Sequence, residues 1–466
     1  MEETIQHAPE LGSRAEKRAF YKHTAAIAAP IALQNFMDAA VGSADVIMLS
    51  FVSQAALAAS SLAGQVMFVM QMLMFGISSG ASVLAAQYWG KGDRCAVEKV
   101  MGLSLRITIL IGAAFSLAAL CVPQLIMRIF TDDAVLIGVG VEYLRYLSPA
   151  YVLGGFAQIY LSVMRSAGRV VMTAAIHCSA VAMNVVLNAC FIFGWGPFPQ
   201  LGIMGVALAT TITRAAEVLV CLIDGLWFSS IRLRVKYLFA RAGQLTKDFM
   251  GMAIPAASND IIWGLAFSVY SMILGHLSSD IVAANSVATV LRNLGTVMCF
   301  GTSNAAAIVL GKTLGENRLA EARVYAKRFV GMAVWTALIG GAAMMLLRPV
   351  VMDFMHLYVT VTDVAKQELH QMIFINAYYI LGVSLNTMLI CGIFRSGGDV
   401  KYGLVCDAIT MWGYAVPVGL ICAFVLKLPE MWVYFILCLD EFVKLPINFW
   451  YYRKRKWLRN ITRDQV

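Results

Sequence analysis

The feature that most constrains the fold is a series of apolar segments, each about eighteen residues long or longer, that recurs along the whole chain. In an α-helix, a segment of this length crosses the hydrocarbon core of a bilayer. Transmembrane β-strands alternate polar and apolar residues instead, so a barrel is excluded. The composition agrees, with 60% hydrophobic residues, 14% charged residues and a mean hydropathy of +0.74. The sequence therefore predicts an all-α polytopic membrane protein.

Twelve transmembrane helices are expected, at residues 25–49, 57–84, 103–121, 143–164, 170–193, 203–226, 250–275, 282–310, 329–348, 369–393, 402–426 and 431–451. Most of the 36 Lys and Arg residues lie at the termini and in the even-numbered loops. The positive-inside rule then places both termini in the cytoplasm. No signal peptide is visible. We expect a multi-pass protein of the cytoplasmic (inner) membrane.

The chain also repeats itself. Pro30 aligns with Pro255, and Gly90 with Gly315, at one and the same shift along the chain, while the Arg-Ser pair at 165–166 aligns with 395–396 at a slightly larger shift. Six spans separate the copies, so both copies have the same orientation. This predicts two six-helix lobes related by a pseudo-twofold axis along the membrane normal, which is a geometry suited to alternating access.

The expected organisation has five parts: an N-terminal cytoplasmic segment (1–24), an N-lobe (25–226), a cytoplasmic linker (227–249), a C-lobe (250–451) and a basic cytoplasmic tail (452–466).

The first span, Ile27–Leu49, carries polar groups that a simple lipid anchor does not need. Pro30 removes a backbone hydrogen bond and predicts a kink, as Pro255 does in span 7. Asp38 and Asp45 are two helical turns apart and share one side of the helix. Carboxylates are costly in hydrocarbon unless they face protein or water, so we expect this helix to line a cation path. In the alternative interpretation, Asp45 lies at the membrane interface and Asp38 is paired with a neighbour.

Spans 5 and 6 offer further polar groups. Asn184 and Asn188 are four residues apart and share a helix face, where their amides could coordinate an ion, and Thr210 of span 6 could offer a hydroxyl toward them. The alternative is ordinary hydrogen bonding between helices. His177, alone near the end of its span, is expected to be structural.

Span 7 carries Asp260, five residues after Pro255, where the first half has Asn35. A carboxylate with aromatic neighbours suits a lipophilic cation. In the alternative, Asp260 is buried and paired with Arg292 of span 8. Other polar or aromatic candidates for a substrate site are Gln34, Asn35, Asn259, Trp263, Tyr270 and Asn386. In span 12, Glu441 and Lys444 are expected to form a local ion pair.

Several classes of function are not supported. The sequence has no GxxxxGK[ST] phosphate loop and no HExxH, so neither an ATP-driven pump nor a zinc-dependent enzyme is indicated. The ten cysteines lie mainly inside apolar runs, without a CxxC pair, and no metal site is expected beyond a possible Na⁺ at Asp45. The net charge of +9 is explained by the basic loops rather than by nucleic acid.

The chain resembles the MATE (multidrug and toxic compound extrusion) transporters of bacterial type. The resemblance lies in Pro30 with its LQN run, SADVIML, NVVLNACFIFG, GPFPQLGIMGVALAT, and the paired turns QYWGKGD and KTLGEN. It implies two six-helix lobes and drug efflux driven by inward Na⁺ or H⁺, without another cofactor. By motif match, it also implies that Asp45 is the principal coupling carboxylate, assisted by Asn184, Asn188 and Thr210, and that Asp260 is the counterpart of an acidic residue in span 7.

We therefore expect a secondary antiporter that exports organic cations or amphipathic drugs and acts as a monomer. Within the same superfamily, a lipid-linked precursor flippase or a metabolite exporter is the alternative. The strongly basic cavity that a flippase needs is not indicated, because Arg214 and Arg292 are balanced by Asp38 and Asp260.

Overall fold

A computed structural model describes residues 13–50, 52–239, 243–358 and 362–464. The first half of the described chain forms α1 (Arg14–Ser50), α2 (Gln54–Lys91), α3 (Arg94–Cys121), α4 (Pro123–Phe130), α5 (Ala134–Ser166), α6 (Val170–Phe193), α7 (Ile203–Ile223) and α8 (Val235–Phe239). The second half forms α9 (Gly243–Gly275), α10 (Ser279–Gly315), α11 (Leu319–Tyr358), α12 (Asp363–Thr387), α13 (Val400–Asp407), α14 (Val416–Leu420), α15 (Glu430–Cys438) and α16 (Asp440–Lys454). π-Helical segments continue α7, α12, α13 and α14, at Asp224–Phe228, Met388–Phe394, Ala408–Ala415 and Ile421–Val425.

Among the described residues, eleven helical segments are long and apolar enough to cross a membrane. They overlap the first eleven expected spans, and most of them extend beyond the expected bounds; the first begins at Arg14, inside the expected N-terminal segment. The twelfth, 431–451, is divided between α15 and α16, which meet at Leu439, so neither part alone reaches that length. α9 begins at Gly243, inside the expected linker, because the helix of span 7 extends beyond its apolar stretch.

The internal repeat is visible in the backbone at the helix ends. Gly92 and Asn317, which the repeat aligns, both have positive φ, at +83° and +60°. Gly168 and Gly398, which follow the two aligned Arg-Ser pairs, have φ of +88° and +77°. A left-handed residue ends a helix by letting the chain turn back on its last carbonyls, and glycine and asparagine adopt it at little cost. The paired turns of the sequence are therefore paired helix ends.

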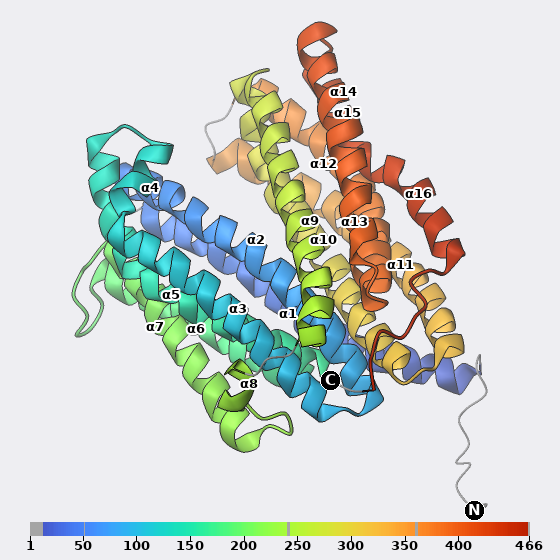
Figure 1. Cartoon of the computed structure of the whole chain (residues 1–466). Helices are drawn as coiled ribbons and strands as arrows, with labels where there is room; N and C mark the ends of the chain where they lie inside the picture. Colours follow the sequence, from blue (N-terminus) through green and yellow to red (C-terminus); the bar gives the residue numbers. More distant parts are fainter. Residues whose placement is uncertain (1–12, 51, 240–242, 359–361, 465–466) are drawn as a thin grey trace, which may run out of the picture.

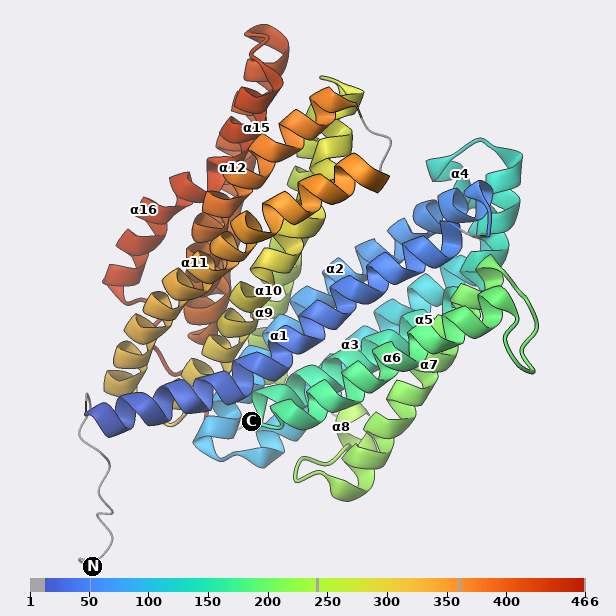
Figure 2. The ribbon, with the colours of Figure 1, turned by 180° about the vertical axis from the view of Figure 1, so that it is seen from behind.

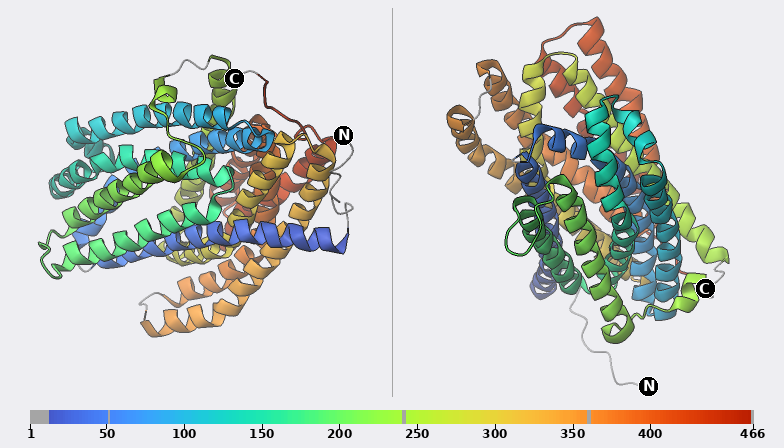
Figure 3. Two further views of the ribbon diagram at one scale, coloured as in Figure 1. Left: turned by 90° about the horizontal axis from the view of Figure 1, so that it is seen from below. Right: turned by 90° about the vertical axis from the view of Figure 1, so that its left-hand side faces the viewer.

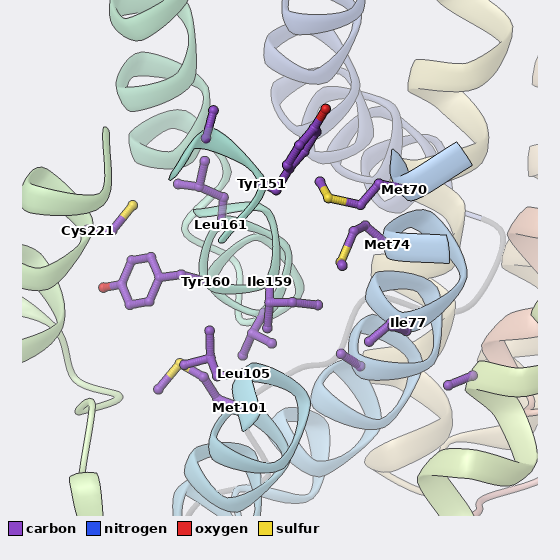
Figure 4. Packing of buried hydrophobic residues seen from close by; sticks show 14 of the residues in the cluster. Met70, Met74, Ile77, Met101, Leu105, Tyr151, Ile159, Tyr160, Leu161 and Cys221 are labelled. Atoms are coloured by element: carbon purple, nitrogen blue, oxygen red, sulfur yellow. The ribbon is translucent and has the colours of Figure 1, made fainter. Parts of the chain in front are cut away.

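The helices form two bundles that meet at one end of the molecule and diverge toward the other (Figures 1 and 2). The first bundle, the N-lobe, packs around a core that includes Met70 and Met74 of α2 and Tyr151 and Tyr160 of α5 (Figure 4). The second bundle, the C-lobe, has one core built from its own helices and a second core that also contains residues of α1, such as Phe20 and Ile31. We call the end where the lobes meet, which also carries the C-terminal residues, the tail end.

Helix α1 belongs to both lobes. Its first half packs on the C-lobe, where Arg328 of α11 donates to both carboxylate oxygens of Glu16, at 2.6 and 2.5 Å, and Phe20 packs against Tyr325 and Phe329. Its second half contacts α6 of the N-lobe. Pro30 lies inside this continuous helix, and Figures 2 and 3 show α1 as a long curved helix that runs across both bundles.

Close contacts between the lobes occur at positions that the internal repeat aligns. A Cβ added at Gly76 of α2 would lie 2.2 Å from the Ala257 backbone of α9, and one at Gly301 of α10 would lie 3.0 Å from Ala32 of α1. The repeat aligns Gly76 with Gly301 and Ala32 with Ala257, so the two contacts are equivalent. At the tail end, a Cβ at Gly90 would lie 2.1 Å from the Lys312 carbonyl oxygen, and one at Gly315 would lie 1.9 Å from that of Gln87. Small residues allow helices in a membrane to approach this closely.

The C-terminal residues form hydrogen bonds at the tail end, where the two lobes meet. Gln87 of α2 donates to the Ser396 carbonyl, at 2.7 Å, and accepts from the backbone N–H of Ile461, at 2.8 Å. Lys91 donates to the Asp464 carboxylate at 2.7 Å, and this ion pair lowers the pKa of the exposed Asp464 carboxyl. The tail therefore ties the end of the N-lobe helix α2 to the C-lobe.

Replacing Gly315 by valine is expected to separate the lobes at the tail end, because the new side chain would overlap the Gln87 carbonyl. Hydrogen–deuterium exchange of the peptides covering the ends of α2 and α10 should rise in Gly315→Val. It should remain unchanged in the control Gly331→Val, where an added Cβ meets nothing within 4 Å. Equal exchange in both variants would show that this contact does not hold the lobes together.

Candidate functional site

A cluster of four charged or titratable side chains joins three helices of the N-lobe. The His177 ring of α6 lies between two carboxylates, with Nε2 2.9 Å from Oδ1 of Asp38 in α1 and Nδ1 2.9 Å from Oε1 of Glu217 in α7. Arg214 of α7 donates to the other oxygen of Glu217 at 2.6 Å. The Glu217 side chain is fully buried, whereas that of Asp38 is 52% exposed. The cluster thus extends from a buried carboxylate to an accessible one.

This geometry needs a proton in addition to those of a neutral imidazole. A neutral histidine has one N–H and one acceptor nitrogen, whereas both nitrogens of His177 face carboxylate oxygens. The two contacts form only if the ring is protonated on both nitrogens or if one of the carboxyls carries the proton. Loss of that proton removes one of the two hydrogen bonds. Asp38 is the more exposed of the two carboxylates, so the proton can be exchanged with water on its side of the ring. The cluster can therefore hold α1 against α6 in a proton-dependent manner.

Arg165 of α5, in the first Arg-Ser pair, interacts electrostatically with Asp38. Its Nε atom has no hydrogen-bond partner among the described residues. Asp38 is therefore influenced by a second cationic group in addition to contacting His177.

A second polar group lies nearer the other end of α6. Asn188 donates to Asn184 Oδ1 at 3.2 Å, and Asn184 donates to Thr210 Oγ1 of α7 at 3.4 Å. The predicted proximity of these three residues is confirmed. Asp45, which the sequence pairs with them, belongs to α1, but its side chain lies outside the described residues.

In the C-lobe, Asp260 of α9 pairs with Arg395, the arginine of the second Arg-Ser pair. Arg395 Nη2 is 3.4 Å from Asp260 Oδ1, and Nη1 donates to the Ser79 hydroxyl of α2 at 3.2 Å. The expected alternative partner, Arg292, instead lies over the rings of Phe267 and Tyr379, at 5.4 and 5.8 Å from their centroids. Asp260 is thus paired, as the alternative interpretation proposed, but with a different arginine.

A buried network fills the C-lobe between α12, α13 and α16. The Lys444 ammonium lies 3.0 Å from Asp407, 2.8 Å from Glu441 and 3.8 Å from Asp440. The expected Glu441–Lys444 pair is confirmed as one part of this larger network. Tyr270 and Asn386, expected near a substrate, belong to it, since Tyr270 donates to Asp440 at 3.4 Å and Asn386 to Glu441 at 2.8 Å.

The other substrate candidates lie in α1 and α9. Gln34 is buried and donates to the Thr173 carbonyl at 3.3 Å. Asn259 is also buried, and its Oδ1 has no partner among the described residues. Asn35 is half-buried, and Trp263 is exposed and packs on Phe267. Within the part of the chain that the structure describes, no group of His, Cys, Asp and Glu side chains is arranged to hold a metal ion.

Comparison with known proteins agrees with this architecture. The MatE family model matches residues 30–190 and 255–421, two segments that begin at Pro30 and Pro255. The chain belongs to the MatE family. The predicted resemblance and the expected fold, an all-α membrane protein with two six-helix lobes, are therefore confirmed. MatE proteins are membrane transporters rather than enzymes, and they need no cofactor.

Two curated relatives and two solved structures illustrate the similarity. The chain is 23% identical to "Uncharacterized transporter YisQ" of Bacillus subtilis, over 92% of this chain and 93% of the relative. It is 24% identical to "Probable multidrug resistance protein NorM" of Burkholderia mallei, over 85% and 84%. Crystal structures of MATE in the straight and in the bent conformation align with TM-scores of 0.85 and 0.84. Both are 19% identical and cover 94% of this chain, and the match covers 96% and 95% of their own chains.

Sequence reasoning missed two residues of the N-lobe cluster in this MatE transporter. His177 was expected to be structural, and Glu217 was not singled out. Their partners lie 139 residues away for the His177–Asp38 contact and 40 residues away for His177–Glu217. The available signal was that spans 1, 5 and 6 each carried a titratable residue inside an apolar run.

Proposed function

We propose that this protein is a secondary active antiporter that exports amphipathic organic compounds, including organic cations, in exchange for inward-moving protons. The observation that carries the proposal is the His177 ring held between Asp38 and Glu217, because this arrangement requires an exchangeable proton and joins α1 to the rest of the N-lobe. The multidrug resistance names of relatives such as NorM support export of drugs.

We further propose that the tail end faces the cytoplasm, as the distribution of basic residues indicates. The close packing of α2 and α10 at this end then corresponds to a state closed to the cytoplasm. Protons arriving from outside reach Asp38 and His177 in this state. A proton can drive the cycle only by binding one of the two lobe arrangements more tightly than the other, and a hydrogen bond between α1 and α6 that needs the proton provides such a difference.

Transport into and out of proteoliposomes tests this proposal. The purified full-length protein is reconstituted, and ethidium export is followed with a pH gradient alone, a Na⁺ gradient alone, or neither. We expect accumulation against the ethidium gradient only when the imposed pH gradient drives protons inward. Accumulation driven by Na⁺ alone would overturn the choice of proton, and no gradient-driven accumulation of any compound in a cation panel would overturn antiport.

The carboxylate of Asp45 is expected to act with Asn184, Asn188 and Thr210 in the same coupling process. We therefore expect Asp45→Asn to abolish gradient-driven ethidium export while the protein still reaches the membrane in normal amounts. A matched control is Asp132→Asn, which alters an acidic residue in the exposed turn before α5. Undiminished export by Asp45→Asn would exclude the coupling role.

A further inference from the structure

The charge on Asp260 is already matched in this structure. The Asp260–Arg395 pair is formally neutral, so a cation that approaches it gains little unless the guanidinium moves away. The contact is a single one of 3.4 Å, and Arg395 uses its other terminal nitrogen on Ser79. No described group donates to the second carboxylate oxygen of Asp260, whose side chain is 23% exposed. An incoming cation thus has an oxygen to bind and a weakly held competitor to replace.

Arg395 also connects the two lobes. Asp260 belongs to the C-lobe helix α9, and Ser79 to the N-lobe helix α2. The same two helices are in backbone contact at Gly76–Ala257, and a Cβ added at Gly80 would lie 3.0 Å from Ala253. Any separation of α2 from α9 along this seam pulls Ser79 away from Arg395.

We infer that Arg395 is an internal counter-ion that competes with cationic substrates for Asp260, and that its release by a cation breaks the Arg395–Ser79 bridge between the lobes. The inference rests on the proposed function and assigns the organic cation to Asp260.

The direction of transport follows from the two arrangements. With the lobes packed at the tail end, Ser79 helps to hold Arg395 beside Asp260, and the cation is excluded. With the lobes apart at this end, the bridge is absent and the cation competes more effectively. A ligand shifts such an equilibrium by its difference in affinity for the two states. Cations are therefore taken up while the lobes are apart at the tail end and are released after the lobes pack together there.

Binding and exchange measurements on the full-length protein in nanodiscs test this inference, with ethidium as the cation and Nile red as an uncharged dye. Arg395→Gln is expected to bind ethidium about tenfold more tightly than the wild type, and Asp260→Asn should abolish this gain in the double variant. Nile red affinity should not change. The control Lys401→Gln removes an exposed positive charge from the same end of the C-lobe and should leave both affinities unchanged.

The Arg395–Ser79 hydrogen bond between the lobes is tested by hydrogen–deuterium exchange, independently of affinity. Ethidium should raise hydrogen–deuterium exchange at the tail end of α2 in the wild type, while Ser79→Ala should show raised exchange before ethidium is added. Arg395→Lys, which keeps the charge but cannot span both partners with a planar fork, should behave like Ser79→Ala in exchange and should bind ethidium more tightly than the wild type but less tightly than Arg395→Gln. Unchanged ethidium affinity in Arg395→Gln, or a gain that persists without Asp260, would overturn the inference.

Failure of the proposed antiport can be distinguished from failure of the counter-ion role of Arg395. If ethidium binds with the expected Arg395 dependence but is never exported by a gradient, antiport is wrong and the counter-ion role stands. If export proceeds and Arg395→Gln leaves affinity unchanged, only the counter-ion role is wrong.

Discussion

Replacement of Lys444 by methionine is expected to destabilise the C-lobe by about 3–5 kcal/mol, because removing one partner of a buried ionic network leaves uncompensated charge. The Lys444 side chain is 2% exposed and lies within 4 Å of three carboxylates, from Asp407, Asp440 and Glu441. Methionine fills a similar volume, so lost packing contributes little. The loss should appear as a lower midpoint of thermal unfolding in detergent.

Two controls make this prediction specific. Lys456→Met removes an exposed ammonium from the tail and should leave the midpoint unchanged. Adding Glu441→Gln and Asp407→Asn to Lys444→Met removes two of the stranded charges and should recover part of the loss. An unchanged midpoint in Lys444→Met would mean that the network carries its charges without this ammonium.

The second large effect concerns His177. His177→Gln should reduce export driven by a pH gradient at least tenfold, or about 1.4 kcal/mol, while leaving the unfolding midpoint close to that of the wild type. Glutamine can donate from its amide to one of the two carboxylates, but it cannot take up and release a proton. Initial rates of ethidium export in proteoliposomes measure the effect.

His276→Gln is the matched control, because His276 is exposed and hydrogen-bonds the Met272 carbonyl of its own helix. Its export rate should equal that of the wild type. Undiminished export by His177→Gln would remove this histidine from the coupling process, and an equal loss in both variants would point to a general effect on the protein.

The sequence predicts the architecture well because the bilayer restricts the choices. Apolar runs fix where helices cross, and the paired Pro30 and Pro255 fix the repeat. The structure extends this repeat to the contacts between lobes at Gly76 and Gly301, which no pattern within one span could reveal. Spacing along a helix also predicts local groups correctly, as for Asn184, Asn188 and Thr210.

Contacts between distant helices are what the sequence cannot supply. Glu441 and Lys444 are three residues apart and were predicted to pair, but Asp407 reaches Lys444 from another helix. For Asp260, the sequence offered Arg292 in the next span. In the structure Arg292 lies over two aromatic rings, and Arg395, far away in the chain, takes the carboxylate. The choice between two arginines depends on tertiary packing.

In the proposed antiport cycle, a proton at His177 is linked to substrate binding. Calorimetric titration of ethidium into the nanodisc-embedded protein, repeated in buffers of different ionisation enthalpy, counts the protons exchanged on binding. We predict that the wild type exchanges about one proton per bound ethidium and that His177→Gln exchanges none. The same proton exchange in both proteins, or none in the wild type, would contradict the account.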